Sequence, residues 1–185
     1  MRLSLALVLM TLTSWAQPAW SSEEAWQALK QGGMVAVFRH ARAPGTGDPA
    51  NFRLDDCSTQ RNLSEEGRRQ AQHIGDQFRA RQVSVERVLS SRWCRALDTA
   101  RLAFGAMAEP YPSLDSFFSG RDQEPARTQA VRRIIESWRS AGTLVLVTHQ
   151  VNITALTGVF PSEGEMLVLR PLANSGFDIV GRIKL

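Results

Sequence analysis

The chain has 185 residues, of which 43% are hydrophobic and 22% are charged, and its formal net charge at pH 7 is +4. This length is usual for one domain with a hydrophobic core, and no second domain is expected. Arginines are scattered among acidic residues, as in SEEGRRQA at 64–71, which is typical of a solvated mixed surface. A protein that binds nucleic acid or another anionic polymer would gather its basic residues in a stripe, so the composition argues against that class.

The first 20 residues are expected to form a secretory signal peptide. Arg2 precedes an apolar run at 3–12, and the small residues Ala16 and Ala19 follow as candidate cleavage positions. The run is about half of the ~20 residues that a membrane-spanning helix needs, so no stable membrane insertion is expected after cleavage. We therefore expect residues 21–185 to form one domain that works in the periplasm or outside the cell.

Hydrophobic patterns along the rest of the chain alternate between short strands and longer helices. Strands rich in Val and Leu are predicted at 34–38, 85–89 and 143–148. Helices with an apolar face are predicted at 65–81, 92–105 and 126–140, the first two with Ser64 and Ser91 as N-caps. Two closing strands should flank the Asn-Ser-Gly turn at 174–176. This alternation predicts a three-layer α/β/α sandwich with a mostly parallel central sheet.

Residues that carry chemistry follow each of the predicted strands. Arg39 and His40 follow the first strand, the segment 90–95 with Arg95 follows the second, and His149 follows the third. Ligands of open α/β sheets bind beyond the carboxyl ends of the strands, so these side chains are expected to meet at one edge. The irregular stretch at 41–62 is long for a compact domain, and such a loop is usually functional.

Arginine and histidine at one sheet edge point to phosphate chemistry. The rigid fork of an arginine matches two phosphate oxygens at once. Arginines on both sides of His40 disfavour a proton on its ring, and an unprotonated imidazole nitrogen is a nucleophile. A bound phosphate would neutralise the arginines around the ring.

Four sequence motifs resemble those of a known family. Arg39-His40, LSEEGRRQA at 63–71, LSSRWCRALDTA at 89–100 and VTH at 147–149 are similar, in order and in their place after strands, to motifs of the histidine phosphatase superfamily. The resemblance is to its phosphoglycerate-mutase-like branch and spans about residues 34–160. It implies a phosphoglycerate mutase-like fold and an enzyme that needs no cofactor.

The resemblance also assigns roles to individual residues. His40 would be the nucleophile that becomes phosphorylated, while Arg39 and Arg95 would hold the phosphate oxygens. His149 would complete the pocket and support the transition state. Arg42 would lie near the pocket rim, the alternative being a solvated loop arginine. His73, the third histidine, is expected on the polar side of its helix and outside the site.

The chain departs from the family pattern around both histidines, which leaves the general acid open. Ala41 stands where the family usually has Gly, and Gln150 stands where Gly or Asp is common, which excludes an acid directly after His149. The family's acid lies between the second arginine motif and the last histidine, and Asp115 is favoured there. Its alternative role is a turn or helix cap. The other candidate acids are Glu109, Asp122, Glu124, Asp48, Asp55 and Asp56.

The two cysteines and the absence of ligand clusters complete the expected site. Cys57 and Cys94 are predicted to form a disulfide because two cysteines in an oxidising compartment usually pair, although two free buried thiols are an alternative. No cluster of His, Cys and carboxylates at ligand spacing accompanies the motifs, and the arginines supply the charge that a metal would give. A metal-independent enzyme is therefore expected.

These features together predict a phosphomonoester hydrolase that acts through a phosphohistidine intermediate. Its substrate would be a small phosphorylated molecule outside the cytoplasm, with an envelope phosphosugar as one candidate. Mutase activity is disfavoured because the chain lacks the long insertion that the mutases carry before the last histidine. Two alternatives stay open, a phosphohistidine or phosphoprotein phosphatase and a non-catalytic protein that binds phosphorylated ligands. The oligomeric state is not predicted.

Overall fold

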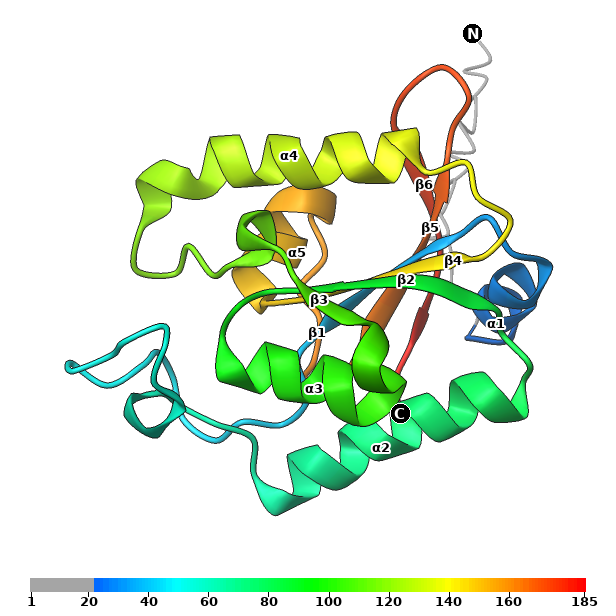
Figure 1. The fold of residues 1–185 in the computed structure, drawn as a ribbon. Coiled ribbons are helices and arrows are strands. Elements are labelled where there is room, and N and C mark those ends of the chain that lie inside the picture. The colour runs from blue at the N-terminus through cyan, green and yellow to red at the C-terminus, as the bar shows by residue number, and fades with distance from the viewer. Residues whose placement is uncertain (1–21) are drawn as a thin grey trace, which may run out of the picture.

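A six-stranded sheet with helices on both faces forms the centre of the protein (Figure 1). The computed structural model describes residues 22–185, so the expected signal peptide lies outside the described residues. The strands are β1 (Val35–Arg39), β2 (Val85–Ser90), β3 (Ala108–Pro110), β4 (Thr143–Thr148), β5 (Met166–Pro171) and β6 (Phe177–Ile183). The α-helices are α1 (Ser22–Gln31), α2 (Glu65–Ala80), α3 (Cys94–Phe104), α4 (Glu124–Ser137) and α5 (Gln150–Thr157). No helix in this part of the chain is long and apolar enough to cross a membrane.

The sheet order is β3-β2-β4-β1-β5-β6. The first four strands of this order run parallel to their neighbours, whereas β5 pairs antiparallel with β1 and β6 pairs antiparallel with β5. The predicted α/β sandwich with a mostly parallel sheet is therefore confirmed, as are the two closing strands around the turn at 174–176. Three 3₁₀ turns, at Pro112–Leu114, Arg121–Gln123 and Cys57–Thr59, lie in the connections near the sheet edge.

The two faces of the sheet pack against different helices because successive strand residues point to opposite sides. In β1, Ala36 and Phe38 join a core with α1, α2 and α3, while Val35 and Val37 join a second core with α4 and α5. Strand β4 alternates in the same way and all of its residues are buried. This explains why the central strands read as nearly continuous apolar runs.

Of the two N-caps predicted from the sequence, one is observed and the other is not. The Ser64 hydroxyl accepts the Gly67 amide at 3.0 Å and caps α2, as predicted. Ser91 does not cap the following helix, because α3 begins at Cys94 and its N-cap residue is Trp93. The Ser91 side chain is instead turned into the site, where it contacts His149.

Three elements were not predicted from the sequence. Helix α1 directly follows the expected signal peptide, β3 has only three residues and ends in proline, and α5 has eight residues with little difference between its faces. Strand β3 is too short and α5 too uniform to show a periodic pattern, whereas α1 does carry an apolar face, formed by Ala25, Trp26, Ala28 and Leu29. Helix α5 matters for function because it begins one residue after His149.

The start of the 41–62 loop lies directly on α2. A side chain at Gly67 would place its Cβ atom 2.0 Å from the Arg42 carbonyl oxygen, so only glycine fits this helix position. The same carbonyl accepts the Ser64 amide at 3.1 Å. The Gly in the LSEEGRRQA motif therefore permits the loop and the helix to touch, which fixes where the loop leaves the sheet.

A disulfide joins the far part of this loop to the start of α3. Cys57 and Cys94, the pair predicted from the sequence, are bonded with their Cα atoms 5.7 Å apart. Beside it, the Gln60 side chain accepts the Cys94 amide at 3.0 Å. The loop is thus held near its start by the contact of Arg42 with α2, and farther along by the disulfide and the Gln60 hydrogen bond.

Replacing both cysteines, Cys57→Ser with Cys94→Ser, is expected to lower the free energy of unfolding. The bridge closes a loop with a sequence separation of 37, for which chain entropy predicts a stabilisation of about 4 kcal/mol. Denaturant unfolding of the mature protein and the double variant measures the difference. Equal stability of the two proteins would contradict a stabilising role for the bridge.

Candidate active site

The register of the central strands brings the two predicted histidines together. Arg39 at the end of β1 is paired with Thr148 at the end of β4, so His40 and His149 follow side by side. Their ring centroids are 5.4 Å apart, and the residues are only 2% and 3% exposed. Parallel pairing of β1 and β4 is therefore what converts two distant motifs into one site.

The ring of His40 is held in one orientation. Its Nδ1 lies 2.8 Å from the Ala41 carbonyl oxygen, and its backbone amide donates to the Thr148 carbonyl at 2.9 Å. A carbonyl can only accept, so in the neutral ring the hydrogen is on Nδ1 and the lone pair is on Nε2. His40 therefore carries a nucleophilic nitrogen on the side of the ring away from its own backbone.

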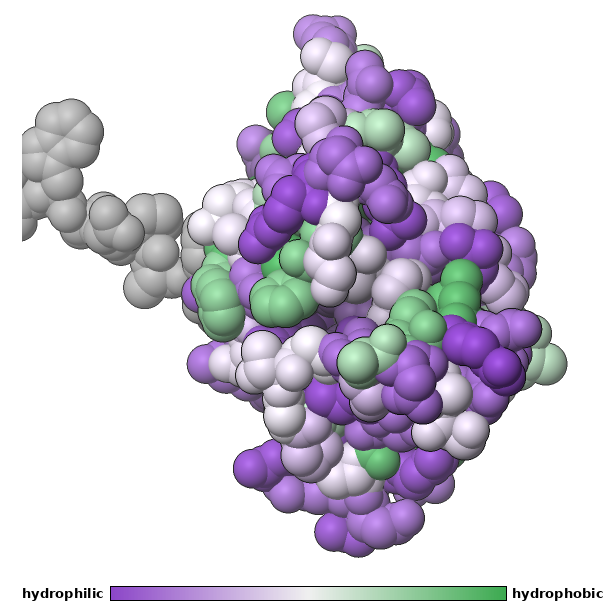
Figure 2. Space-filling model, turned by 90° about the vertical axis from the view of Figure 1, so that its left-hand side faces the viewer, coloured by the Kyte–Doolittle hydropathy of each residue, from purple (hydrophilic) through white to green (hydrophobic). Residues whose placement is uncertain are grey.

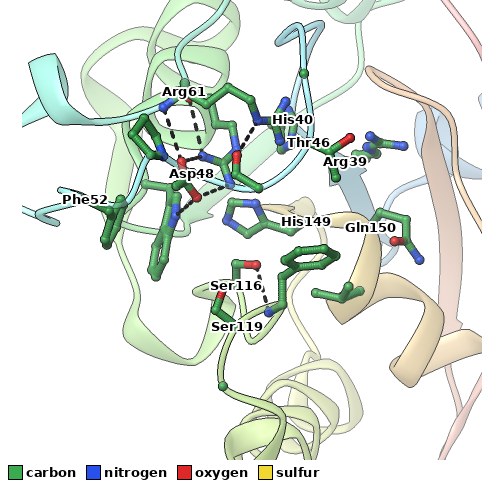
Figure 3. Close-up of a pocket in the computed structure, with 18 of the residues that line it drawn as sticks. Arg39, His40, Thr46, Asp48, Phe52, Arg61, Ser116, Ser119, His149 and Gln150 are labelled. Atoms are coloured by element: carbon green, nitrogen blue, oxygen red, sulfur yellow. Dashed lines mark hydrogen bonds and ion pairs between the residues drawn. The ribbon is translucent and has the colours of Figure 1, made fainter.

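Three arginines surround the histidines and line one cavity with them (Figure 3). Arg39 and Arg95, both predicted, are joined by Arg61, and the side chains of Arg61 and Arg95 are 15% and 4% exposed. Burial is the largest cause that lowers the pKa of His40 well below its usual value, followed by the charge of Arg95 and then those of Arg61 and Arg39. Burial and the same arginines lower the pKa of His149. Both imidazoles are therefore neutral in the ligand-free protein.

Two guanidinium nitrogens in the site have no hydrogen-bond partner. The Nε atoms of Arg39 and Arg95 are buried and unpaired. The Nη1–Nη2 edge of Arg95 is already occupied by Asp48, at 2.7 and 3.2 Å, and Nη1 of Arg39 donates to the Pro161 carbonyl at 3.0 Å. An unpaired buried donor is costly unless a ligand satisfies it. These two donors are therefore available to a ligand that brings acceptor oxygens to the histidines.

Asp48 is the one carboxylate among the described residues that line this cavity. It accepts hydrogen bonds from Arg95, from the Trp93 indole at 3.0 Å and from the Arg61 amide at 3.2 Å. Burial opposes its ionisation, but the hydrogen bond and charge of Arg95 outweigh that effect and lower the pKa of Asp48. Asp48 therefore holds Arg95 by one edge and leaves the Nε side of that guanidinium for a ligand.

Asp115 lies behind the cavity and does not line it. Its fully buried carboxylate is paired with Arg92, which donates from Nε at 2.8 Å and from Nη2 at 2.6 Å. It reaches the site only through Ser91, whose hydroxyl is 3.4 Å from Asp115 and 2.8 Å from Nε2 of His149. The structure therefore places Asp115 two hydrogen bonds away from the cavity, at the end of a chain that leads to His149.

Arg42, predicted at the pocket rim, is directed elsewhere. Its guanidinium donates to Glu66 at 2.6 Å, and both side chains are more than half exposed. It borders a separate groove with Glu66, Gln70 and His73. The alternative reading, a solvated loop arginine, is the correct one, because the 41–62 loop turns away over α2 directly after His40. Five other candidates for the general acid also do not line the cavity: Glu109, Asp122, Glu124, Asp55 and Asp56.

Sequence reasoning missed Arg61 and the aromatic wall of the cavity. Arg61 ends the 41–62 loop, where it donates from Nε to the Gly47 carbonyl at 2.9 Å. One feature of the sequence could have indicated Arg61. It lies at the end of the 41–62 loop, for which a function was expected, three residues before the N-cap Ser64 of α2. Phe52 and Trp93 stack on each other at 5.1 Å between ring centroids and form one wall. The cavity measures about 530 Å³.

Residues 35–118 match the family model described as histidine phosphatase superfamily (branch 1). This segment contains the predicted nucleophile and the arginine motif of α3, and the sheet has the fold of that family's solved members. Over these residues the chain is similar to the histidine phosphatase superfamily. No curated protein sequence matches the chain significantly.

Several solved structures have the same fold and align with most of this chain. The protein histidine phosphatase SixA complexed with tungstate is 17% identical, covers 82% of this chain and 96% of its own, and has a TM-score of 0.58. Phosphoserine phosphatase from Entamoeba histolytica, in complex with 3-phosphoglyceric acid, is 13% identical with coverages of 82% and 97% and a TM-score of 0.61. A mycobacterial glucosyl-3-phosphoglycerate phosphatase is 18% identical with coverages of 79% and 96% and a TM-score of 0.59. At these identities the likeness establishes the fold.

The two buried histidines are expected to make the protein less stable as the pH falls below about 6.5. Their pKa values are depressed in the folded state, so the unfolded chain binds protons that the native protein does not. The stability present above the unfolded pKa is then lost on acidification, by up to about 1.4 kcal/mol per pH unit for each histidine. Denaturant unfolding at several pH values between 7 and 5 measures the slope.

The variant His149→Asn should flatten this pH dependence, and His73→Ala serves as the control. His73 is exposed on α2 and outside the cavity, so its removal should leave the slope unchanged. A slope that is the same in His149→Asn as in the parent protein would show that His149 does not stay neutral in the fold.

Proposed function

We propose that the protein is a metal-independent phosphomonoester hydrolase that acts through a phosphohistidine on His40. The observation that carries the proposal is the free Nε2 of a neutral, buried His40 beside two buried guanidinium donors without partners. An anion with several acceptor oxygens suits these donors, and a phosphoryl group also presents the electrophilic phosphorus that the imidazole nitrogen attacks. A protein that only binds phosphate would not need the nucleophile.

The chemistry proceeds in two displacements at phosphorus. In the first, the Nε2 lone pair of His40 forms an N–P bond while the P–O bond to the leaving group breaks and the leaving oxygen takes up a proton. In the second, water attacks the phosphorus, its proton is accepted in the site, and the N–P bond breaks to release phosphate. Arg39, Arg61 and Arg95 stabilise the charge on the non-bridging oxygens in both steps. Because they supply fixed positive charge, no metal ion is required.

We assign delivery of the leaving-group proton to His149, which takes a proton from solvent when phosphate binds and donates it from Nδ1, because its Nε2 is held by Ser91. Ser91 and Asp115 act behind it. Asp48, the cavity carboxylate, is held by Arg95 with a lowered pKa and is a poor donor. His149 faces the cavity, and the negative charge of a bound phosphate offsets the arginines that lower its pKa. The chain from Nε2 through Ser91 to the Asp115 carboxylate fixes the ring and stabilises its charged form, as the third member of a catalytic triad does.

The substrate is proposed to be a small phosphorylated molecule outside the cytoplasm, such as an envelope phosphosugar. The expected signal peptide and the disulfide, a bond typical of oxidising compartments, support this location. The names of the solved structures include a protein histidine phosphatase, a phosphoserine phosphatase and a phosphatase of a glucosyl-phosphoglycerate, so the fold does not select among these substrates. The similarity to the protein histidine phosphatase makes a phosphohistidine phosphatase the second candidate.

Replacement of the nucleophile tests the proposal directly. His40→Ala is expected to abolish turnover of nitrophenyl phosphate, because no N–P bond can form. Rapid quenching of the wild type with a labelled phosphate ester should trap an acid-labile phosphate on His40, located by mass spectrometry at neutral or basic pH. The same assay with a chelator should give an unchanged rate.

Three outcomes would count against parts of this proposal. Full activity in a folded His40→Ala protein would exclude the covalent mechanism. Binding of phosphate without turnover of any ester would favour the non-catalytic binder. Activity that disappears with chelator and returns with a divalent ion would show that the metal-independent mechanism is wrong.

The proton path is tested by comparing two leaving groups. A nitrophenolate leaves without protonation, whereas an alkoxide does not. Asp115→Asn and Ser91→Ala are therefore expected to lower turnover of an alkyl phosphate by roughly 10²- to 10⁴-fold while reducing that of nitrophenyl phosphate much less. The ratio of the two rates in each folded variant is the quantity to measure.

Asp48→Asn provides the matched comparison, because it removes the cavity carboxylate and leaves the Asp115–Ser91–His149 chain intact. If Asp48 were the donor, the ratio would change in this variant and stay constant in the other two. An unchanged ratio in Asp115→Asn and Ser91→Ala would rule out the proposed path.

A further inference from the structure

The part of the cavity beyond the arginines is lined by rings and by uncharged groups. Aromatic side chains there come from three separate segments: Phe52 of the loop, Trp93 before α3 and Phe118 after β3. The charged side chain of this part, Arg127, is already occupied, since its Nη1 donates to the Asp115 and Ser116 carbonyls at 2.8 and 3.0 Å. A leaving group placed here therefore meets apolar surface and a few neutral polar groups.

Trp93 and Phe52 form a flat wall that borders the phosphate site. The two rings are stacked with an angle of 22° between their planes. The indole is fixed by its hydrogen bond to Asp48, and its ring centroid lies 5.6 Å from that of His149 in an edge-on arrangement. A ring attached close to the ester oxygen of a bound phosphate can therefore reach this wall while the phosphorus is next to His40.

Phe118 also lines the cavity and is 49% exposed. A Cβ atom on Gly47 would be 3.9 Å from its ring, so Phe118 lies close to the 41–62 loop that also carries Phe52. Figure 2, which shows the face on the side of this loop, has apolar groups among the hydrophilic ones that dominate the surface. Because Phe118 lines a concave site, its ring is available to contact a ligand there.

We propose that the substrate's leaving group carries an uncharged ring, aromatic or sugar, that packs between the Trp93–Phe52 wall and Phe118. This inference rests on the proposed phosphatase function and specifies its substrate class. The cavity of about 530 Å³ lies within the range of small-molecule sites and is larger than a phosphate group alone requires. Rings stack on aromatic side chains, whereas an extended chain gains little from a flat wall.

The test measures kcat/KM for benzyl phosphate and for propyl phosphate, two esters whose leaving groups are both alkoxides. The ratio of the two values cancels effects on the phosphate site itself. Phe118→Ala and Phe52→Leu are each expected to lower this ratio about tenfold, the size of an aromatic contact. Phe160→Ala is the matched control, because Phe160 is 67% exposed and does not line the cavity. Its ratio should equal that of the wild type.

Glucose phosphate as a third ester separates the two kinds of ring, and a larger fall for benzyl or for glucose phosphate in the variants identifies which one the wall accepts. An unchanged ratio in both Phe118→Ala and Phe52→Leu would overturn the inference, as would a higher kcat/KM for a phosphoserine peptide, whose leaving group has no ring, than for either ring ester. If no phosphate compound of any kind is turned over by the wild type, the proposed function itself fails, which is a distinguishable result.

Discussion

The ion pair between Arg95 and Asp48 is the contact on which the rest of the site depends. Arg95 is 3% exposed, and a guanidinium at that depth requires a partner. The sheet and helices around it offer none, so the partner comes from the 41–62 loop, at 2.7 Å. The position of the loop is therefore determined by a charge on α3, and the loop in turn forms one side of the cavity.

The residues next to Arg95 strengthen the same connection. Trp93 donates to Asp48, and Cys94 is bonded to Cys57 and donates its amide to Gln60. Three consecutive residues at the start of α3 thus hold three points of one loop. The 41–62 loop contains little regular structure, so ordering it by hydrogen bonds alone would cost much conformational entropy. The disulfide reduces that cost.

The extent to which the sequence predicts this site follows from the kind of interaction involved. His40, His149 and Arg95 could be found because strand ends of a parallel sheet converge whatever the loops do. Arg42 was predicted because it is close to His40 in the sequence, yet the loop leaves the site after Ala41, lines the cavity again at 45–50 and at Phe52, and supplies its arginine only at Arg61. Which residue of an irregular loop faces inward depends on tertiary partners, and no periodic pattern records that.

Asp115 shows the same limit for a charged residue. Its place in the sequence agrees with the expected acid, but Arg92, which lies within the motif at 89–100, pairs with its carboxylate. Its backbone carbonyl also accepts from Arg127 and from Asn152 of α5, at 2.8 and 2.9 Å. These contacts come from segments of which one, α5, was not predicted at all, so the burial of Asp115 could not be anticipated.

The electrostatic balance of the cavity links substrate binding to protonation. Without ligand, Arg39, Arg61 and Arg95 outweigh the single charge of Asp48 in the cavity lining, and both histidines stay neutral for that reason as well as through burial. In the proposed mechanism neutrality suits His40, which offers a lone pair, but not His149, which donates a proton. A phosphate dianion reverses the local excess of charge beside both rings, and only His149 has a hydrogen-bonded path to a further carboxylate. His40 cannot share this benefit, because its Nδ1 is already bound to a neutral carbonyl and its Nε2 faces the phosphorus. In the proposed mechanism the same buried arginines therefore keep His40 unprotonated before substrate arrives and, once their charge is offset, allow His149 to take a proton from solvent and pass it to the leaving group.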